Sequence, residues 1–489
     1  MKVCLVNPPF LFPRREDAVL SHCLGLRGLS SHLRSLGHEV TLVDALLLGF
    51  QERRAEAGGW LVGLAPEAIV ERVPEDVQLI GVTAPFSQSA PLVHELCAAL
   101  KGRFPDALLV MGGVYPSAQP ESALRAEVDA IVVGEGETVL AALADGVGAA
   151  GLAGTYCPNG SREGVFERSR LVADLDTLAP PDTEVPHFTK YLGCSPRGAT
   201  GRTASVVTSR GCPFDCEFCS IHPVYGRSFR ARSAEVVLDE VERLVRGFGV
   251  RAIEIEDDNF TLDRGRAASI LEGFVRLRET AGDVPFTWRP PNGIRIDGID
   301  RDLLHLMMRS GCTEVVFGLE HGDPLMHDLM GKHLDLGAAF EMVKLCVQLG
   351  IPRITLFYMI GYPGETKEMF ESGLRYLERI RALGGPVTVS MNLAQPYPGT
   401  RLLERCRAEG CDIDASYDDP LHRPGVMSTR TVIGVTSRGL DEAEILRRRE
   451  LVMRLFGPRW KSVVKRGIPP RALRHLGAAR PVSGRWKGS

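Results

Sequence analysis

Three cysteines lie close together in the segment TSRGCPFDCEFCSIHPVYG, residues 208–226. They are Cys212, Cys216 and Cys219, with the spacing Cys-x3-Cys-x2-Cys. A structural zinc site is closed by four ligands, usually two Cys-x-x-Cys pairs, and no second pair occurs here, so His222 would have to complete the set. A [4Fe-4S] cluster held by three thiolates leaves one iron open to another ligand, which suits catalysis. The spacing therefore favours a catalytic iron–sulfur cluster over structural zinc.

The other nine of the 12 cysteines are scattered, several of them inside apolar runs such as MVKLCVQLG. Disulfides seldom persist in a reducing cell interior, and a free cysteine in an apolar run behaves as a small buried hydrophobe. We interpret all nine in this way: Cys4, Cys23, Cys97, Cys157, Cys194, Cys312, Cys346, Cys406 and Cys411.

A series of strands and helices must position the cysteine loop. Six short apolar runs follow residue 200, and helical patterns such as SAEVVLDEVERLVRGFG lie between them. Six such units predict a parallel α/β array, either an open sheet or a partial (β/α)6 barrel similar to a TIM barrel, with its active site at the carboxyl ends of the strands. The cysteines follow the first strand and so lie at that face. The predicted strands cover residues 204–208, 251–256, 285–289, 313–319, 353–360 and 386–393.

The second of these strands ends in a run of acids, IEIEDDNFT. Side chains alternate along a strand, so the two isoleucines of residues 253–256 face one side and the two glutamates face the other. With helices outside, the glutamates face the barrel interior, where a buried charge is costly unless it meets a ligand or a cation. We therefore take Glu256, Asp257 and Asp258 as ligand-binding candidates; the alternative is a strand-end turn with solvated acids.

Residues 1–145 predict a separate α/β domain. The apolar runs KVCLVNPP, HEVTLVDA, LIGVTAPFS, ALLVMGGVYP and AIVVGEGE alternate with helical patterns, as parallel strands buried on both faces do. Such a doubly wound, Rossmann-like domain binds its ligand over the carboxyl ends of its strands. Gly, Pro and Asp interrupt residues 146–200, which predict a linker or strap. Residues 201–400 form the predicted barrel, and residues 401–489 a small, mostly helical segment that shapes the substrate pocket.

The composition, 44% hydrophobic and 24% charged with a formal net charge of −3, is that of a globular protein. This balance argues against a nucleic-acid partner. The basic tail after Arg447 keeps an RNA-modifying enzyme as an alternative, against the simpler interpretation of a solvated basic helix. The N-terminal apolar run is too short for a signal peptide, and no run approaches the ~20 apolar residues of a membrane span. The sequence therefore predicts a cytoplasmic protein.

The cysteine spacing, with Phe218 before the third cysteine and a strand before the loop, resembles the signature of the radical SAM superfamily over roughly residues 200–400. The resemblance implies a [4Fe-4S] cluster whose open iron is chelated by S-adenosylmethionine (SAM), with Phe218 near the adenine, and cleavage of SAM to a 5′-deoxyadenosyl radical. By the same resemblance, VVFGLEHGD reaches SAM through Glu320, and FYMIGYPGET pairs with adenine through its backbone near Gly361. The acids at 256–258 would hold SAM or substrate.

Two features of these segments stay open. Family members often have serine where this chain has His321, so the resemblance implies no role for that histidine. Gly361, Pro363, Gly364 and Glu365 also fit a plain turn between a strand and a helix, as does QPYPGT after the sixth strand.

Four segments of the first domain, taken in order, resemble the cobalamin-binding (B12-binding) domain that precedes many radical SAM domains: GLRGLSSHLRSLGHEVTLVDA, TAPFSQS, VMGGVYPSAQP and VVGEGETV. The Asp-x-His-x-x-Gly motif that supplies a histidine to cobalt in many cobalamin proteins is absent, and no histidine is expected in the first loop. A domain that has lost cobalamin would share this absence. Otherwise the resemblance implies a cobalt lower face without a strong protein ligand. The implied cobalamin contacts are Asn7, Pro8, Pro9, Phe10, Thr83, Ser87, Gly112, Gly113, Gly134 and Glu135.

Taken together, the two resemblances imply a cobalamin-dependent radical SAM methyltransferase. One SAM would methylate cobalamin, a second would give the adenosyl radical, and the substrate radical would collect the methyl group from methylcobalamin. The implied partners are a small-molecule or natural-product substrate and an electron donor such as flavodoxin or ferredoxin. The alternatives are a radical SAM enzyme that does not transfer methyl, such as an oxidative cyclase, a ring-contracting or a tetrapyrrole-modifying enzyme, and, from another class, a zinc-stabilised binding module.

Overall fold

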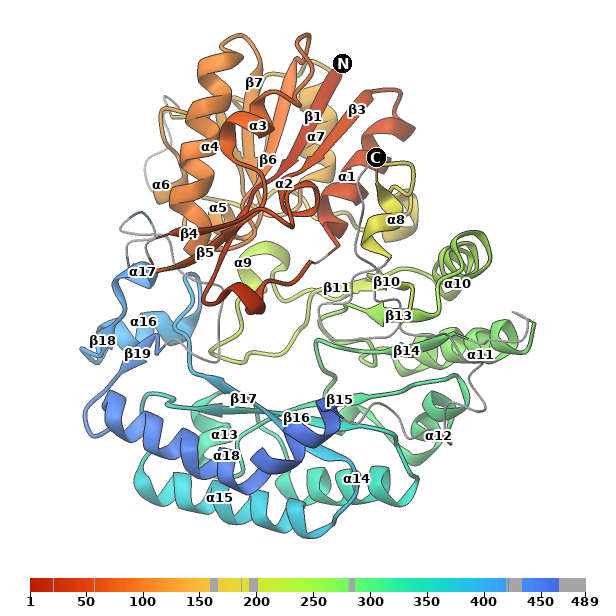
Figure 1. Cartoon of the computed structure of the whole chain (residues 1–489), viewed down its shortest axis with the longest axis vertical. Coiled ribbons are helices and arrows are strands. Elements are labelled where there is room, and N and C mark those ends of the chain that lie inside the picture. Colours follow the sequence, from red (N-terminus) through yellow and green to blue (C-terminus); the bar gives the residue numbers. More distant parts are fainter. Residues whose placement is uncertain are drawn as a thin grey trace.

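The computed structural model describes residues 1–20, 22–56, 58–158, 166–185, 187–192, 201–280, 286–418, 421 and 433–465. Two α/β units are stacked along the long axis of the molecule, and the N-terminal unit lies at the top in Figure 1. Among the described residues, no helix is long and apolar enough to cross a membrane. Cys194 and the first residue of the strand predicted at 285–289 lie outside the described residues.

The N-terminal unit is a six-stranded sheet whose first five strands are parallel, as the sequence predicts for a doubly wound domain. The sixth strand pairs antiparallel with its neighbour and extends the sheet beyond residue 145. The sequence did not predict it, because two residues show no periodicity. The order is β3 (Glu39–Asp44), β1 (Lys2–Asn7), β6 (Leu79–Thr83), β7 (Leu108–Gly112), β8 (Ala130–Val132) and β9 (Thr155–Tyr156).

Helices cover both faces of this sheet. On one face, Val3 and Leu5 of β1 pack with residues of α1 (Leu24–Ser35) and α7 (Glu137–Ala144). On the other, Cys4 and Val6 pack with residues of two further helices. This alternation buries every residue from Val3 to Asn7, which explains the continuous apolar run in the sequence. The two helices on the second face are α3 (Pro66–Val70) and α4 (Ala90–Arg103).

A small antiparallel sheet follows β1 where the sequence predicted only a loop. Its strands are β2 (Phe10–Phe12), β5 (Gly59–Val62) and β4 (Arg53–Glu56), and the short helix α2 (Ala45–Leu48) lies between β3 and β4. The result is that Phe10 is buried at the carboxyl edge of the main sheet.

The second unit has the six predicted parallel strands in chain order. Two three-stranded sheets are linked by parallel bridges, Trp288 to Cys312 and Ile294 to Phe317, which makes one curved array. This is the predicted partial barrel. Its strands are β10 (Thr203–Val206), β13 (Ala252–Ile255), β14 (Thr287–Arg289), β15 (Val315–Glu320), β16 (Ile354–Ile360) and β17 (Val387–Leu393).

Five helices follow the barrel strands and pack outside them (Figure 1). They are α10 (Ala234–Glu242), α11 (Arg264–Thr280), α12 (Arg301–Arg309), α14 (Leu336–Gln348) and α15 (Lys367–Ala382). The π-helical turn η4 (Arg243–Gly247) extends α10.

The C-terminal segment completes the outer layer of the barrel. Its long helix α18 (Glu442–Lys465) packs on α15, β16 and β17, where a helix following β17 is expected. The interpretation of the tail after Arg447 as a solvated helix is wrong for Arg448 and Val452, which are buried. The other elements of this segment are α16 (Arg401–Ala408), β18 (Asp412–Ile413), α17 (Ala415–Asp418) and β19 (Val435–Thr436).

Residues 166–185, inside the predicted linker, bind both units. The Asp182 carboxylate accepts a hydrogen bond from Ser30 of α1, 2.8 Å away. The Asp176 carboxylate accepts one from the backbone N–H of Ser233 at the start of α10, at 2.9 Å. We call residues 166–185 the strap.

Candidate functional site

The three cysteines lie on a loop at the carboxyl end of β10, at the end of the barrel that faces the N-terminal unit (Figure 1). Cys212, Cys216 and Cys219 are half-buried. The loop ends in the short helix α9 (His222–Tyr225), which contacts the N-terminal unit through α5 (Val114–Ala118).

A two-stranded hairpin, β11 (Ser209–Arg210) with β12 (Arg230–Ala231), carries the cysteine loop. Gly211 lies between β11 and the first cysteine, with φ of +82°. A Cβ at this position would lie 2.1 Å from the carbonyl oxygen of Ser228, so only glycine fits. The Gly211 N–H donates to the Asp258 carboxylate at 2.9 Å. These contacts fix the point at which the loop begins.

Burial disfavours the thiolates that would bind iron, and a nearby cation offsets this in part at Cys216. Burial raises the pKa of all three thiols, that of Cys219 to about 12, while the charge of Lys332 opposes the effect at Cys216. Within the described part of the chain, no three His, Cys, Asp or Glu side chains converge as the ligands of one metal ion do. Three thiols on one loop with a cation beside them fit a [4Fe-4S] cluster, in which each thiolate binds a different iron.

Two acids inside the loop hold it against the rest of the barrel. The Glu217 carboxylate accepts hydrogen bonds from Tyr362 Oη at 3.0 Å and Arg405 Nε at 3.1 Å. The Asp215 carboxylate pairs with Arg227 and Arg401. The sequence did not predict these partners, because they come from segments up to 188 residues away without a motif.

Paired charges fill the barrel interior. Arg289 at the end of β14 pairs with Glu254 on β13 and with Glu314, whose Oε2 lies 3.1 Å from the guanidinium. Ser205 Oγ lies 3.3 Å from Glu256 Oε1. The predicted alternation is confirmed, since Ile253 and Ile255 belong to the apolar core and Glu254 meets a cation inside the barrel. A contact between Glu256 and SAM stays a prediction.

Asp257 differs from what the sequence suggested, while a ligand contact of Asp258 stays a prediction. Asp257 is buried, and its carboxylate accepts hydrogen bonds from the backbone N–H of Thr208 at 2.6 Å, from the Thr208 hydroxyl and from Ser209 Oγ at 2.6 Å. Asp257 is therefore neither a solvated turn acid nor a free ligand-binding group: it fixes the end of β10. Burial raises the pKa of Asp258 to about 6.

Glu320 stands at the carboxyl end of β15 with φ of +65°, next to a register shift in that strand. Its carboxylate accepts a hydrogen bond from Lys332 Nζ at 3.0 Å, and both side chains are buried. A Cβ at Gly318 would lie 2.6 Å from that nitrogen, so the glycine leaves room for the pair. The predicted SAM contact of Glu320 remains a prediction, with Lys332 as a partner that no motif marked.

His321 points toward the outer helices. It stacks on Tyr358 with ring centroids 5.2 Å apart, and its Nδ1 accepts a hydrogen bond from the Asp323 N–H at 3.1 Å. Its Nε2 then carries the proton and donates to the Glu365 carboxylate at 3.1 Å. Glu365 also pairs with Arg448 of α18 at 3.1 Å. The role left open for His321 is thus structural, since it links β15 and β16 to the C-terminal helix.

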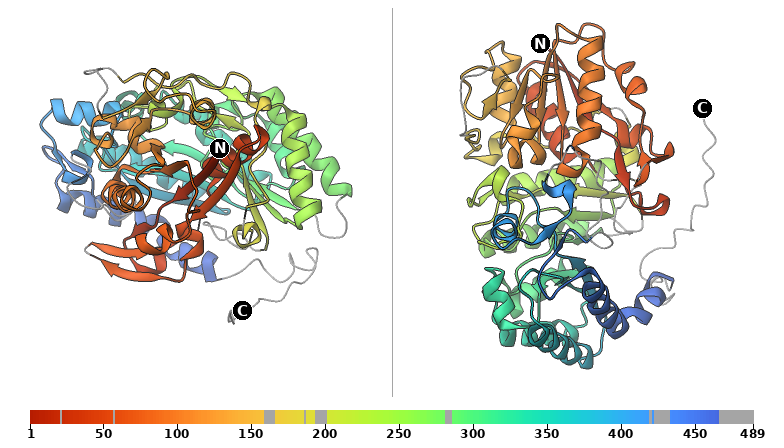
Figure 2. Two further views of the ribbon diagram at one scale, coloured as in Figure 1. Left: turned by 90° about the horizontal axis from the view of Figure 1, so that it is seen from above. Right: turned by 90° about the vertical axis from the view of Figure 1, so that its left-hand side faces the viewer.

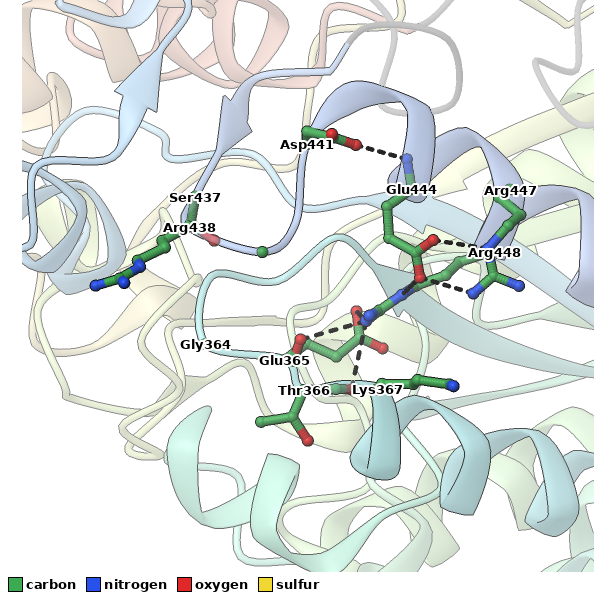
Figure 3. Close-up of a pocket in the computed structure, with 11 residues that line it drawn as sticks. Gly364, Glu365, Thr366, Lys367, Ser437, Arg438, Asp441, Glu444, Arg447 and Arg448 are labelled. Atoms are coloured by element: carbon green, nitrogen blue, oxygen red, sulfur yellow. Dashed lines mark hydrogen bonds and ion pairs between the residues drawn. The ribbon is translucent and has the colours of Figure 1, made fainter.

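In the GYPGET segment after β16, the contacts of Gly361 and Glu365 support the interpretation of a turn between a strand and a helix. The Gly361 N–H donates to Glu365 at 3.3 Å, and a Cβ on Gly361 would lie 3.3 Å from Ile445 of α18. A cavity of about 700 Å³ lies beside this turn. Figure 3 shows Arg448 reaching from α18 toward Glu365. It is lined by Gly364, Glu365, Thr366, Lys367, Ser437, Arg438, Gly439, Asp441, Glu444, Arg447 and Arg448. No residue of the cysteine loop lines it.

In the N-terminal unit, glycines lie at the carboxyl edge of the sheet. Gly113 follows β7 with φ of +118°, and a Cβ there would lie 2.8 Å from the Ala84 carbonyl oxygen after β6. Next to it, a Cβ on Gly112 would meet nothing nearer than Val132 at 3.9 Å. Gly112 thus leaves space at the predicted cobalamin site, whereas Gly113 lets the ends of β6 and β7 pack closely. The other predicted contacts at this edge are Thr83, half-buried, Ser87, buried, and Gly134, with φ of +95°.

The connection after β1 is anchored to its neighbours. The Asn7 amide donates to Asp44 at 2.8 Å, and Tyr191 of the linker donates to the same carboxylate at 2.6 Å. Phe10 meets Phe86 edge to face, with centroids 5.9 Å apart, and Phe86 is 40% exposed.

Pro9 and His22 also lie in the connection between β1 and α1. Pro9 packs under Gly63, where a Cβ would lie 2.8 Å from the Pro9 Cβ. The expectation of no histidine in the first loop is wrong, because α1 begins only at Leu24 and His22 precedes it, stacked on Tyr191.

Glu135 does not lie free at the predicted cobalamin site. Its carboxylate accepts hydrogen bonds from Arg210 and Arg230 of the cysteine hairpin and from the backbone N–H of Val172 in the strap. The sequence suggested a cofactor contact because the residue follows a strand of the N-terminal sheet. Its partners instead belong to the barrel unit and the strap.

The carboxyl ends of the two sets of strands face each other. Pro223 of α9 and Ala118 of α5 both lie against Gly399, at 2.6 and 3.4 Å from where its Cβ would be. The strap's Arg168 donates to the carbonyl oxygen of His222. The side view in Figure 2 shows the two units in this stacked order.

Two family models match the two units separately. Residues 16–144 match the B12 binding domain, and residues 206–377 match the radical SAM superfamily. The chain thus carries a B12-binding domain followed by a radical SAM domain. The partial barrel is its radical SAM domain, as the resemblances in the sequence implied.

Known proteins match this chain over most of its length. The chain is 29% identical over 417 residues to an uncharacterized methyltransferase of Pyrococcus horikoshii, covering 83% of each chain. It is 27% identical over 469 residues to the cytidylyl-2-hydroxyethylphosphonate methyltransferase of Streptomyces wedmorensis, covering 87% of this chain and 86% of that one. Among solved structures, it resembles the radical SAM methyltransferase TsrM from Kitasatospora setae, solved with cobalamin and a [4Fe-4S] cluster. The TM-score is 0.67 at 21% identity, over 84% of this chain and 80% of that one.

Proposed function

We propose that this protein transfers a methyl group from SAM to an unactivated carbon of a small molecule, with cobalamin as the methyl carrier. The observation that carries the proposal is that the glycine edge of the B12-binding domain faces the cysteine loop of the radical SAM domain. When bound, the cluster and SAM supply a 5′-deoxyadenosyl radical, and cobalamin supplies the methyl group. The protein contributes position and exclusion of water, since the cofactors carry the difficult chemistry.

In the radical SAM domain, we assign binding roles to side chains near the cysteine loop. Cys212, Cys216 and Cys219 would hold the cluster, with Phe218 beside the adenine. Glu320 would bind the amino or ribose end of SAM, and Lys332 holds its carboxylate in place through a hydrogen bond of 3.0 Å. The paired charges between β13, β14 and β15 keep the barrel interior polar, which suits a small, polar substrate.

In the B12-binding domain, Gly112 and Gly113 would let the nucleotide tail of cobalamin approach the backbone closely. Thr83 and Ser87 lie on the neighbouring strand end and would contact the same tail. The residues from Asn7 to Phe10 would lie below cobalt. The exposed ring of Phe86 beside Phe10 offers this face an apolar surface.

We also propose that a reduced flavodoxin or ferredoxin delivers the electron, in the cytoplasm, where free thiols persist. Beside the cysteine loop, Arg227 and Arg401 of α16 have side chains that are 54% and 46% exposed. Both flank Asp215, so the local charge is positive and complements an acidic carrier. The rate of cluster reduction by flavodoxin should fall as salt rises, and Arg227→Ala with Arg401→Ala should lower it at low salt. Equal rates in wild type and double variant would contradict this docking site.

The test of the proposed function is anaerobic reconstitution with iron, sulfide and hydroxocobalamin. We expect a brown protein with about four iron atoms and about one cobalt per chain. Reduction in the presence of SAM should yield 5′-deoxyadenosine. If cobalamin does not co-elute, the methyl-transfer proposal falls, while the radical chemistry is still tested by 5′-deoxyadenosine.

The reaction type is decided by SAM labelled with deuterium in its methyl group. A methyltransferase forms both S-adenosylhomocysteine and 5′-deoxyadenosine in each turnover and places the label in its product. A cyclase or ring-contracting enzyme forms 5′-deoxyadenosine without a labelled product. That second result would replace methyl transfer by the alternative chemistry.

A further inference from the structure

Four charged side chains meet where the two domains join. Glu135 and Glu137 come from the GEGE segment after β8, and Arg210 and Arg230 stand opposite each other on the β11–β12 hairpin. Arg210 binds both glutamates, at 2.8 Å to Glu135 and 2.7 Å to Glu137. Arg230 binds the Glu135 carboxylate through two nitrogens, at 2.8 and 2.9 Å. We call these four residues the interdomain clamp.

The clamp is buried and its charges are balanced. The side chains of Glu135 and Glu137 are 2% and 8% exposed, those of Arg230 and Arg210 11% and 20%. Burial opposes ionisation of Glu135, but the hydrogen bond from Arg230 and the charge of Arg210 outweigh it and hold its pKa below the ordinary value. Such pairs form only in one geometry, because each bidentate contact fixes both distance and orientation.

The strap closes the clamp from a third side. The backbone N–H of Val172 donates to Glu135 at 2.8 Å, and the Val172 carbonyl accepts from Arg230 at 2.6 Å. Ser169 Oγ donates to the Glu135 carbonyl oxygen at 2.7 Å. The partners described here for the Glu135 carboxylate thus belong to the hairpin or to the strap.

The clamp residues are close in sequence to both halves of the candidate site. Arg210 is followed by Gly211, which cannot carry a side chain, and then by Cys212. Gly134 precedes Glu135 at the carboxyl edge of the B12-binding sheet. A displacement at the clamp therefore moves the cysteine loop relative to that edge.

We infer that Glu135 and Glu137 are positioning residues that hold the cysteine loop at a fixed place relative to the B12-binding domain. This inference rests on the proposed function, because it concerns the separation of the cluster from cobalt. The glutamates act through Arg210 and Arg230 and are not assigned a contact with either cofactor.

The experiment compares the wild type with Glu135→Gln and Glu137→Gln after reconstitution with iron, sulfide and hydroxocobalamin. After partial reduction, power saturation of the cob(II)alamin electron paramagnetic resonance signal reports its magnetic coupling to the reduced cluster. We expect the relaxation enhancement in Glu135→Gln to fall by at least about twofold at unchanged iron and cobalt content, and by less in Glu137→Gln, which leaves Arg210 one carboxylate. Loss of stability alone would not change this coupling in protein that retains both cofactors. The matched control is Glu95→Gln, an exposed residue of α4 in the same domain.

A second measurement needs no cofactor. Hydrogen exchange of the full-length apoprotein should be at least about tenfold faster at the amides of Val172 and Gly211 in Glu135→Gln than in wild type or Glu95→Gln. Unchanged coupling together with unchanged exchange at these two amides would overturn the inference. If wild type binds no cobalamin, the proposed function fails, and the exchange measurement still decides whether the clamp holds the loop.

Discussion

The two strand edges that face each other in this molecule differ in the charge of the residues they carry. The edge of the B12-binding domain presents the glycines Gly112 and Gly113 and the exposed ring of Phe86, beside the hydroxyl side chains of Thr83 and Ser87. The barrel opposite it holds buried charges in pairs, such as Glu320 with Lys332. A corrin ring offers a broad, largely apolar face, whereas SAM and the cluster are small and charged. The contrast teaches that the side chains at each edge match the polarity of the cofactor expected there. Variants at each edge can test this match.

The largest effect is expected from the cysteine loop. Replacing Cys212, Cys216 and Cys219 by Ala removes all three cluster ligands, so the absorbance near about 400 nm and 5′-deoxyadenosine formation should disappear. Cobalamin content should stay near that of wild type, because the opposite edge has its own contacts. Cys157→Ala, outside the loop, serves as the control. Simultaneous loss of cobalamin would show that the two edges are not independent.

The next effect concerns the paired charges of the barrel interior. Arg289→Met removes the cation that both Glu254 and Glu314 contact. Breaking a buried pair costs about 3–5 kcal/mol of unfolding free energy, because carboxylates are left buried without that cation. Urea denaturation measures it, with Arg309→Met on the outer helix α12 as the control. A loss no larger than the control's would mean that these charges are compensated by other groups.

A smaller loss is expected at the edge of the B12-binding domain. Gly113→Ala places a Cβ 2.8 Å from the Ala84 carbonyl oxygen at a φ that side chains rarely adopt. The strain and the contact together should cost about 2–4 kcal/mol and weaken cobalamin binding. In Gly28→Ala, within α1, the new Cβ meets nothing within 4 Å, so stability should rise by about 0.5–1 kcal/mol. Thermal unfolding and equilibrium dialysis with hydroxocobalamin check both variants; equal effects would refute the role of Gly113.

The smallest effect is a pH dependence of the barrel. Burial lowers the pKa of His327 from 6.5 to about 4, and its Nε2 donates to the His321 carbonyl oxygen at 2.8 Å. Since the unfolded chain binds the proton first as pH falls, this group costs stability as pH drops from about 6.5 toward about 4. The loss between pH 7.5 and pH 5 should be about 2 kcal/mol. The difference in urea unfolding free energy between these pH values should shrink by that amount in His327→Gln. An unchanged difference would assign the pH dependence to other groups.

Much of this fold could be predicted from the sequence, because parallel strands that are buried on both faces have continuous apolar sequences. All six barrel strands and five strands of the first sheet were expected within a few residues. The cysteine loop was found because its ligands are neighbours in the chain. The two-residue strand β9 was missed because so short a strand has no pattern.

The errors have a common physical cause: the sequence shows where a residue lies but not which partner reaches it. Glu135 was expected to meet a cofactor, yet arginines about 75 and 95 residues away take its carboxylate. Arg448 was counted with a solvated helix, yet it is 2% exposed and bound to Glu365. Lys332 carries no motif and became visible only through its 3.0 Å contact with Glu320.

The strap determines where the chain must be cut if the B12-binding domain is to be transferred to another protein. A cut at residue 145 would follow the end of the family match, but it would remove β9 from the edge of β8 and detach Asp182 from α1. The exchangeable piece is therefore residues 1–192, which keeps β9 and the strap with the domain. A chimera built that way would still need an acceptor barrel with arginines at the positions of Arg210 and Arg230, or the transplanted domain would arrive with two buried acids and no counter-charge.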